Sequence, residues 1–247
     1  MTARRNFLDL DFDPLTPEQA EAWLAARGQA SPFAYIVTPN VDHMVRLASQ
    51  PQAIRAAYDD ADLCLCDSRV LARLAKLADV ALTVVPGSDL VAALFDRVLK
   101  PGDRVCLIGG GPDHVTRLGE RYPGIVVLHH MPPMGLRTNP AARAAAVDFA
   151  ARSDARAILL AVGSPQQELL AHEMKADGRV RGTALCIGAG IDFIVGAQVR
   201  APHIVQKAGF EWAWRLASQP RRLAKRYLVD GPAIFPLVWR WKRSRGR

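Results

Sequence analysis

The carboxylate best placed for chemistry is Asp67, which directly follows the apolar segment 63–66. A carboxylate at the end of a buried strand lies in a low-dielectric setting, which raises its pKa toward that of a useful general base. Asp67 could instead cap a helix expected to begin near Val70, because aspartate is frequent at helix N-caps. The residues alone support the base and the helix cap equally.

Other polar or glycine-rich segments also follow apolar runs. Asn40 is either a turn residue or a ligand contact. Gly109 and Gly110 could let backbone amides approach a phosphate, and a tight strand-to-helix turn would explain them equally well. Gln167 and Glu168 open an expected helix, where they either cap the first turn or, through Gln167, bind a sugar hydroxyl or a uracil edge.

Two well-known nucleotide-binding motifs are absent from the sequence, and one candidate metal site is present. His114 stands where a dinucleotide-binding fingerprint from Gly109 needs its last glycine, and the chain has no Gly-Lys dipeptide for a Walker A loop. Asp9, Asp11 and Asp13 alternate along an expected edge strand and could form a divalent cation site. We interpret them as solvated carboxylates and expect no metal site.

These residues are positioned by alternating strands and helices. The expected strands are rich in Val, Ile and Leu and mostly lack polar alternation, which is typical of strands buried on both faces. They cover residues 34–37, 63–66, 82–85, 105–108, 125–128, 158–162 and 184–187. Helices are expected from the Thr16 cap through Ala26 and over 70–78, 89–99, 140–152 and 167–176. The pattern predicts an α/β, Rossmann-like, mostly parallel sheet with helices on both faces, whose ligands bind at the carboxyl ends of the strands.

Composition fits a folded chain in a reducing compartment. Half of the 247 residues are hydrophobic and 23% are charged, which suffices for a real core. The four cysteines lie in apolar runs and are expected to be buried thiols. No signal peptide is recognisable and no apolar run reaches the ~18 residues of a spanning helix, so we expect a cytoplasmic or membrane-attached protein.

The positive charge is concentrated at the end of the chain. Residues 200–247 contain 12 Lys and Arg against two acidic residues, a net charge of +10, and four of the five tryptophans. We therefore expect an α/β core over residues 1–196 and a basic, aromatic, helical appendage over 197–247. Interleaved Trp and Arg fit an anionic membrane surface. Nucleic acid is the competing partner and a solvated basic face the third interpretation; we expect lipid and no nucleic acid. The segment 233–241 is too short to span a bilayer.

Taken in order, the loops resemble the WecG/TagA/CpsF family of bacterial glycosyltransferases over roughly residues 33–227. The motifs that carry the resemblance are TPNVDH at 38–43, DLCLCD at 62–67, GSDL at 87–90, LIGG at 107–110, PQQE at 165–168, GAGID at 188–192, the glycine at 196, RAP at 200–202, GFEW at 209–212, WRL at 214–216, QPRR at 219–222 and RY at 226–227.

The resemblance implies an inverting hexosyltransferase that forms β-linkages and needs no metal or other cofactor. It implies transfer of a hexose or N-acetylhexosamine, such as ManNAc, GlcNAc or glucose, from a UDP-sugar to a saccharide on a polyprenyl (undecaprenyl) diphosphate. The pathway would be cell-envelope polysaccharide or exopolysaccharide biosynthesis, at the cytoplasmic face of the inner membrane as a peripheral protein. The number of subunits stays open, a homo-oligomer included.

The resemblance also implies roles for individual residues. Asp67 matches the base of the family. Residues that match the lining of the active site are Thr38, Asn40 and Gln167. We expect further substrate contacts in the same loops from Gly109, Gly110, Glu168 and Asp192. The residues that match the lipid-diphosphate-binding arginines are Arg215, Arg222 and Arg226.

Three positions depart from the pattern of the family. Ser68 replaces the usual glycine after the base, Gln166 replaces a lysine, and Val84 replaces an arginine thought to stabilise the leaving diphosphate. We hypothesise that Arg69 supplies the lost charge and acts in catalysis. The departures favour an exopolysaccharide pathway over teichoic acid. The rival functions are a UDP-sugar epimerase or oxidoreductase without a lipid acceptor, and a nucleic-acid-binding protein that uses the basic tail.

Overall fold

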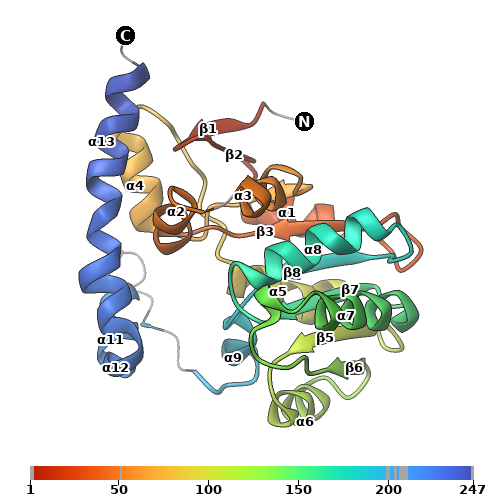
Figure 1. Ribbon diagram of the computed structural model, residues 1–247. Coiled ribbons are helices and arrows are strands. Elements are labelled where there is room, and N and C mark those ends of the chain that lie inside the picture. Colours follow the sequence, from red (N-terminus) through yellow and green to blue (C-terminus); the bar gives the residue numbers. More distant parts are fainter. Residues whose placement is uncertain (1–2, 51, 199–200, 203–204, 206–210, 246–247) are drawn as a thin grey trace.

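The computed structural model describes residues 3–50, 52–198, 201–202, 205 and 211–245 (Figure 1). The strands are β1 (Arg5–Phe7), β2 (Leu10–Phe12), β3 (Ala34–Val37), β4 (Leu63–Cys64), β5 (Arg104–Gly109), β6 (Val126–His130), β7 (Ala157–Ala161) and β8 (Thr183–Cys186). The α-helices are α1 (Pro17–Ala25), α2 (Val41–Leu47), α3 (Gln52–Asp59), α4 (Arg69–Leu77), α5 (Gly87–Ala93), α6 (Pro112–Arg121), α7 (Pro140–Ser153), α8 (Gln166–Asp177), α9 (Gly190–Ile194), α11 (Glu211–Ser218), α12 (Pro220–Ala224) and α13 (Ile234–Arg245). Shorter 3-10 or π turns are η1 (Leu94–Val98), η2 (Leu136–Thr138), η3 (Lys225–Asp230) and η4 (Gly231–Ala233).

Six strands form one parallel sheet in the order β4-β3-β8-β7-β5-β6. This confirms the expected Rossmann-like α/β class. The expected strand over 82–85 is reduced to a single bridge between Cys66 and Val84. Pro86 lies two residues after Val84 and has no N–H to donate, so the hydrogen-bond ladder between these two segments cannot continue.

Side chains along each strand alternate between two apolar layers, one on each face of the sheet. In β3, Tyr35 and Val37 belong to one layer and Ile36 to the other. Helices α3, α7 and α8 pack in the layer of Tyr35, and helices α1, α5, α6 and α9 in the layer of Ile36. Helices therefore cover both faces, as the unbroken apolar strands predict. All four cysteines, Cys64, Cys66, Cys106 and Cys186, are buried free thiols in the layer of Tyr35.

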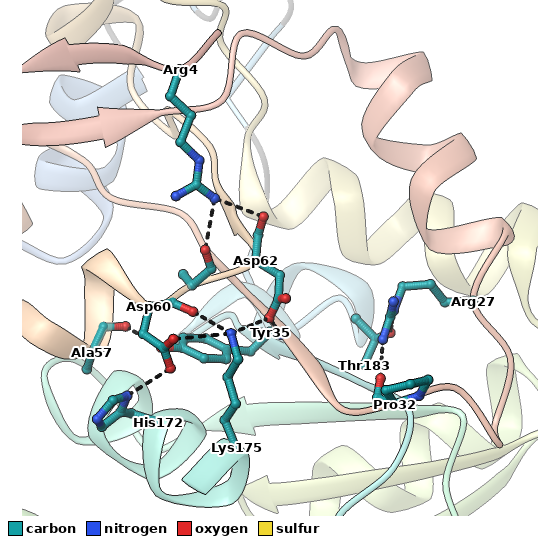
Figure 2. A network of polar contacts seen from close by, with 11 residues as sticks. Arg4, Arg27, Pro32, Tyr35, Ala57, Asp60, Asp62, His172, Lys175 and Thr183 are labelled. Carbon is teal, nitrogen blue, oxygen red and sulfur yellow. Dashed lines mark hydrogen bonds and ion pairs between the residues drawn. The ribbon is translucent and has the colours of Figure 1, made fainter. Parts of the chain in front are cut away.

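A network of charged and polar groups joins the elements at the amino ends of the strands (Figure 2). The Lys175 ammonium donates to the main-chain oxygen of Asp60 at 2.7 Å and lies 3.3 Å from the Asp62 carboxylate. That carboxylate also accepts the backbone N–H of Tyr35 at 3.0 Å, and Arg4 donates to the main-chain oxygen of Asp62 at 3.0 Å. These contacts tie α8, β3 and the N-terminal segment together and leave the opposite, carboxyl edge for ligands.

Helices α11, α12 and α13 and the turns between them form a column beside the sheet, next to α2 and α4 (Figure 1). We call these elements the C-terminal column. The Trp241 side chain on α13 is 8% exposed and its ring lies 5.2 Å from that of Phe7, edge to face. Its Nε1 donates to Asp9 at 3.1 Å. Ile234, Val238 and Trp241 share one core cluster with β1 and β2. Packing thus crosses the expected boundary at residue 196, and that division of the chain stays a prediction.

No helix among the described residues is both long and apolar enough to cross a membrane.

Candidate active site

Asp67 lies between β4 and α4 at the carboxyl edge of the sheet. Its Oδ1 accepts the backbone N–H of Gly87 at 2.7 Å, and its Oδ2 accepts a longer bond from the Asn40 amide at 3.4 Å. Its own N–H donates to the Pro39 carbonyl at 3.1 Å. Two separate segments, the loop after β3 and the start of α5, therefore hold Asp67 in place.

Burial raises the pKa of Asp67 to about 6. The hydrogen bonds from Gly87 and Asn40 oppose this shift, the Glu211 carboxylate adds to it, and the Arg215 guanidinium lowers it. Because the burial effect dominates, the carboxylate binds a proton more tightly than an ordinary aspartate and is still ionised near neutral pH. That is the property expected of a general base.

The alternative role of Asp67 as a helix cap is excluded. Helix α4 is capped by Ser68, whose Oγ accepts the backbone N–H of Leu71 at 3.2 Å. Both carboxylate oxygens of Asp67 point to other segments of the chain.

Asn40 is a turn residue, which is one of the two roles that its position suggested, and a ligand contact stays a prediction. It is the N-cap of α2, where its Oδ1 accepts the backbone N–H of Asp42 at 3.1 Å. Its amide nitrogen faces Asp67, and its Oδ1 also lies 3.4 Å from a guanidinium nitrogen of Arg226. Asn40 therefore links the base to the C-terminal helices.

Thr38 lies against Gly87 at the end of β3. A Cβ added to Gly87 would lie 2.8 Å from the Thr38 hydroxyl oxygen, which is closer than real side chains approach. The absence of a side chain at 87 is thus what lets α5 come near enough for its first N–H to reach Asp67. Thr38 and Asp67 share this neighbour.

Arg226 extends from the C-terminal column to the loop after β3. Its guanidinium lies 3.2 Å from the Asp42 carboxylate, which also pairs with Arg46. The Nε of Arg226 is buried and has no hydrogen-bond partner among the described residues. A buried N–H donor without a partner costs free energy, which an anionic ligand would recover.

Arg215 on α11 faces the same edge. Its guanidinium stacks on the Phe193 ring at 5.4 Å, and its charge acts on Asp67. The Nε of Arg215 is also buried without a hydrogen-bond partner in the described part of the chain. Arg222 belongs to α12, but its side chain lies outside the described residues, as do the motif residues Arg200, Gly209 and Phe210.

Arg69 is exposed in the first turn of α4, two residues after Asp67. The Val84 position lies beside Cys66 through the single bridge described above. The main chain of an arginine at position 84 would therefore lie next to the residue that precedes the base. The main chain of Arg69 lies instead at the start of α4, after the loop that contains the base. The compensation hypothesis stays a prediction.

The glycines after β5 are explained by packing. Gly109 has a φ of +90°, and a Cβ there would meet the Ala161 backbone at 2.8 Å, so β5 and β7 could not pair as they do. Gly110 has a φ of +68° and lies over the His114 ring. The turn interpretation therefore holds, and a phosphate contact from these backbones stays a prediction.

Asp192 is already engaged within the protein. One carboxylate oxygen lies 2.9 Å from Nε2 of His114, and the other accepts from the Gln198 amide at 2.8 Å. His114 Nδ1 accepts the backbone N–H of Gly111 at 3.0 Å, so its Nε2 carries the proton toward Asp192. Asp192 thus holds the glycine loop to the segment after α9, and the expected contact with substrate stays a prediction.

Gln167 and Glu168 are also held internally. Their exposed fractions are 3% and 1%. The Gln167 oxygen accepts the backbone N–H of Gly188 at 2.8 Å, and its amide nitrogen donates to Glu168 at 2.8 Å. Burial raises the pKa of Glu168. Each end of the Gln167 amide therefore has one partner inside the protein, and its contact with substrate stays a prediction.

The three N-terminal aspartates do not form a cluster. Asp13 is buried and accepts from Arg4 at 3.1 Å and from the backbone N–H of Cys64 at 2.8 Å, so the expectation that it is solvated is wrong. Asp9 and Asp11 have separate partners. Among the described residues, no group of three or more His, Cys, Asp or Glu side chains could hold a metal ion.

For two residues of the site, Gly87 and Asp42, the sequence predicted no individual role. Gly87 supplies the shortest bond to the base, and Asp42 orients Arg226. Both stand inside motifs that carry the family resemblance, GSDL and TPNVDH. Nothing in their spacing reveals that one meets Asp67 and the other meets the tail, because both contacts are long-range.

A Rossmann-like sheet that carries a carboxylate of raised pKa and, at the same edge, two arginines with buried Nε atoms can offer a base and positive charge to a ligand. A comparison with known families makes this specific: the model of the glycosyl transferase WecG/TagA/CpsF family matches residues 5–247, more than the stretch of the expected resemblance. The chain belongs to this family and is a glycosyltransferase. Membership implies a nucleotide-sugar donor and a glycan acceptor.

Proposed function

We propose that this glycosyltransferase moves a hexose or N-acetylhexosamine from a UDP-sugar to a saccharide linked to polyprenyl diphosphate, with inversion at the anomeric carbon. One observation supports it best: Asp67, with its pKa near 6, is acted on by the charge of Arg215 and shares Asn40 as a neighbour with Arg226, and the Nε atoms of both arginines are buried without a partner among the described residues. A base for the acceptor hydroxyl and cations for a diphosphate are what this reaction requires.

In the proposed reaction, an acceptor hydroxyl oxygen attacks the anomeric carbon of the donor. The hydroxyl proton passes to the Asp67 carboxylate. The bond from the anomeric carbon to the phosphate oxygen breaks on the opposite face, and UDP leaves with the electron pair. Gly87 and Asn40 hold the base in place through their hydrogen bonds. The proposal includes no metal ion or other cofactor.

Arg215 and Arg226 bind the diphosphate of the acceptor in this proposal. The planar fork of a guanidinium suits phosphate oxygens, which can accept two parallel hydrogen bonds from it. Asp42 holds Arg226 over the loop after β3, so little side-chain entropy remains to be lost when the acceptor binds. Arg222 is assigned the same diphosphate-binding role, on the basis of the family resemblance alone.

The outer surface of the C-terminal helices fits an anionic membrane. Exposed apolar side chains alternate there with exposed cations, and the Arg243 guanidinium lies 4.6 Å from the Trp239 ring centre. The exposed apolar residues of this surface include Leu228, Val229, Phe235 and Trp239. We propose peripheral binding at the cytoplasmic face of the inner membrane, in cell-envelope exopolysaccharide biosynthesis.

The decisive experiment incubates the full chain with a panel of UDP-sugars and a synthetic polyprenyl-diphosphate saccharide, with products read by mass spectrometry. We expect one added hexose or N-acetylhexosamine and a β-linkage by NMR. Asp67→Asn should lower kcat by about 10²- to 10⁴-fold. Asp113→Asn, an exposed carboxylate in the first turn of α6, is the matched control. Conversion of UDP-sugar without acceptor, or full activity of Asp67→Asn, would contradict the proposal.

The role of Arg69 is tested separately. If Arg69 supplies the charge lost at Val84, Arg69→Ala should lower kcat by about 10-fold or more, because the leaving diphosphate loses a cation. Arg69→Lys should restore part of the rate. Unchanged turnover of Arg69→Ala would remove this residue from the mechanism.

A further inference from the structure

A hollow of about 420 Å³ lies between the segment after α9 and helices α11 and α12. Its volume is within the range of small-molecule sites, roughly 300–1,000 Å³. The lining residues are Ala197, Gln198, Trp214, Arg215, Ser218, Gln219 and Leu223.

The lining combines one aromatic face with several hydrogen-bonding groups. Trp214 is 37% exposed and lines the hollow, so part of its side chain is accessible to a ligand there. Gln198 and Gln219 bring amides, and the Ser218 hydroxyl, which donates to the main-chain oxygen of Trp214 at 2.9 Å, can still accept a hydrogen bond. The Gln198 amide nitrogen is used by Asp192, and no described residue donates to its amide oxygen. A pyranose ring has the matching chemistry, since its C–H face is apolar and its hydroxyls donate and accept around the rim. A polyprenyl chain would need a continuous apolar lining instead.

Two contacts connect this hollow to the reaction. Arg215 lines it and also acts electrostatically on Asp67, and its Nε is buried without a partner in the described residues. The wall formed by Gln198 is held through Asp192 and His114 to the glycine loop after β5. A sugar in the hollow would thus lie beside a diphosphate-binding arginine, on the side of the base.

We propose that this hollow binds the saccharide of the acceptor, stacked on Trp214 and hydrogen-bonded by Gln198 and Gln219. This inference rests on the proposed function and deepens it, because it assigns the residues that select the acceptor sugar. The donor is the less suitable occupant, since the sugar whose hydroxyl is deprotonated by Asp67 belongs to the acceptor and must lie on the side of the base, while UDP leaves on the opposite face.

The test measures two dissociation constants with soluble probes and no membrane: decyl diphosphate, and decyl diphosphate that carries N-acetylglucosamine. For the wild-type chain, the sugar should tighten binding about 10-fold, which is about 1.4 kcal/mol. Trp214→Ala should abolish this gain and leave the affinity for decyl diphosphate within twofold. Gln198→Ala should remove part of the gain, and Trp214→Phe should retain most of it because the ring can still stack.

Trp212→Ala is the matched control. Trp212 is on the same helix with the same 37% exposure, but it packs edge-on to Tyr227 at 6.1 Å and does not line the hollow. It should keep the full sugar gain. The inference is overturned if the folded Trp214→Ala variant keeps the gain, or if Trp212→Ala loses as much. If the wild-type chain binds neither probe nor any UDP-sugar, the proposed function itself fails.

Discussion

At the scale of single residues, the site depends on a conflict between burial and charge. Asp67 lies in surroundings that disfavour its ionised form, and the Gly87 N–H recovers only part of that cost. The same burial that makes the carboxylate a good base therefore makes it unfavourable for folding. Two measurable consequences follow, one for rate and one for stability.

The first consequence is a pH dependence of the transfer. Only ionised Asp67 can accept a proton, so kcat/KM should be constant above pH 7 and fall about tenfold per pH unit below the pKa near 6. Initial rates between pH 4.5 and 8.5, with circular dichroism to monitor the fold, would measure this. A rate that stays constant down to pH 5 would show that another group is the base.

The second consequence concerns stability. The pKa of Asp67 is raised from 3.8 to about 6 on folding, so the folded state favours the protonated form. Stability from this group is complete below pH 4 and is lost as the pH rises through 6. Asp67→Asn, which carries no charge, should therefore raise the unfolding free energy by about 1–2 kcal/mol at pH 8 and by little at pH 4. Urea unfolding at both pH values tests this, and a less stable variant at pH 8 would contradict it.

At the scale of elements, the approach of α5 to β3 sets the position of the base. Gly87→Ala would place a Cβ 2.8 Å from the Thr38 hydroxyl oxygen and force the two elements apart. We expect a loss of about 1–3 kcal/mol in unfolding free energy, as for other overpacked sites. Removal of the hydroxyl in the double variant Gly87→Ala, Thr38→Ala should recover most of that loss. Equal stability of the two variants in urea unfolding would mean that this contact is not the constraint.

Histidines at the third position of two helices close the loops at the carboxyl edge. His43 Nδ1 accepts the Asn40 N–H at 3.1 Å, and His114 Nδ1 does the same for Gly111 at 3.0 Å. Both side chains act as the Glu or Gln of a capping box does. Burial, together with Arg46 and Arg226, lowers the pKa of His43 to about 3, which keeps its Nδ1 unprotonated. The stability from this bond is therefore present above the unfolded pKa and is lost as the pH falls below about 6 toward 3.

Local sequence signals predicted most of the elements. The Thr16 cap, with Pro17 and Gln19 behind it, forms the expected capping box, and the apolar runs gave six of the seven expected strands. The exception over 82–85 failed because Pro86 ends the ladder. For the site, the position of Asp67 directly after an apolar run correctly predicted a carboxylate at the carboxyl edge of the sheet. The interactions that define its chemistry, with Gly87, Asn40 and Arg215, are long-range, so no local pattern contains them.

At the scale of the whole molecule, two neighbouring tryptophans on α13 should have opposite roles. Trp241 is 8% exposed and packs on Phe7, whereas Trp239 is 55% exposed. Trp241→Ala should lower the unfolding free energy by about 3–5 kcal/mol. Trp239→Ala should change it by less than about 0.5 kcal/mol and reduce binding to phosphatidylglycerol vesicles several-fold.

The vesicle measurement needs two controls. Phosphatidylcholine vesicles should bind the wild-type chain weakly, because the exposed arginines have no anionic headgroups to meet. Added salt should weaken binding to phosphatidylglycerol. Equal binding to both lipids, or equal stability of the two tryptophan variants, would contradict the assignment of one indole to the core and the other to the membrane.

The contact between Phe7 and Trp241 joins segments that are far apart in the sequence. During synthesis on the ribosome, β1 and β2 emerge long before α13, the helix that packs on them. The apolar face of β1 and β2 is therefore incompletely covered until α13 has emerged. Chaperones that bind exposed apolar segments have a long opportunity at this hairpin, and a stop codon before α13 would leave its apolar face uncovered.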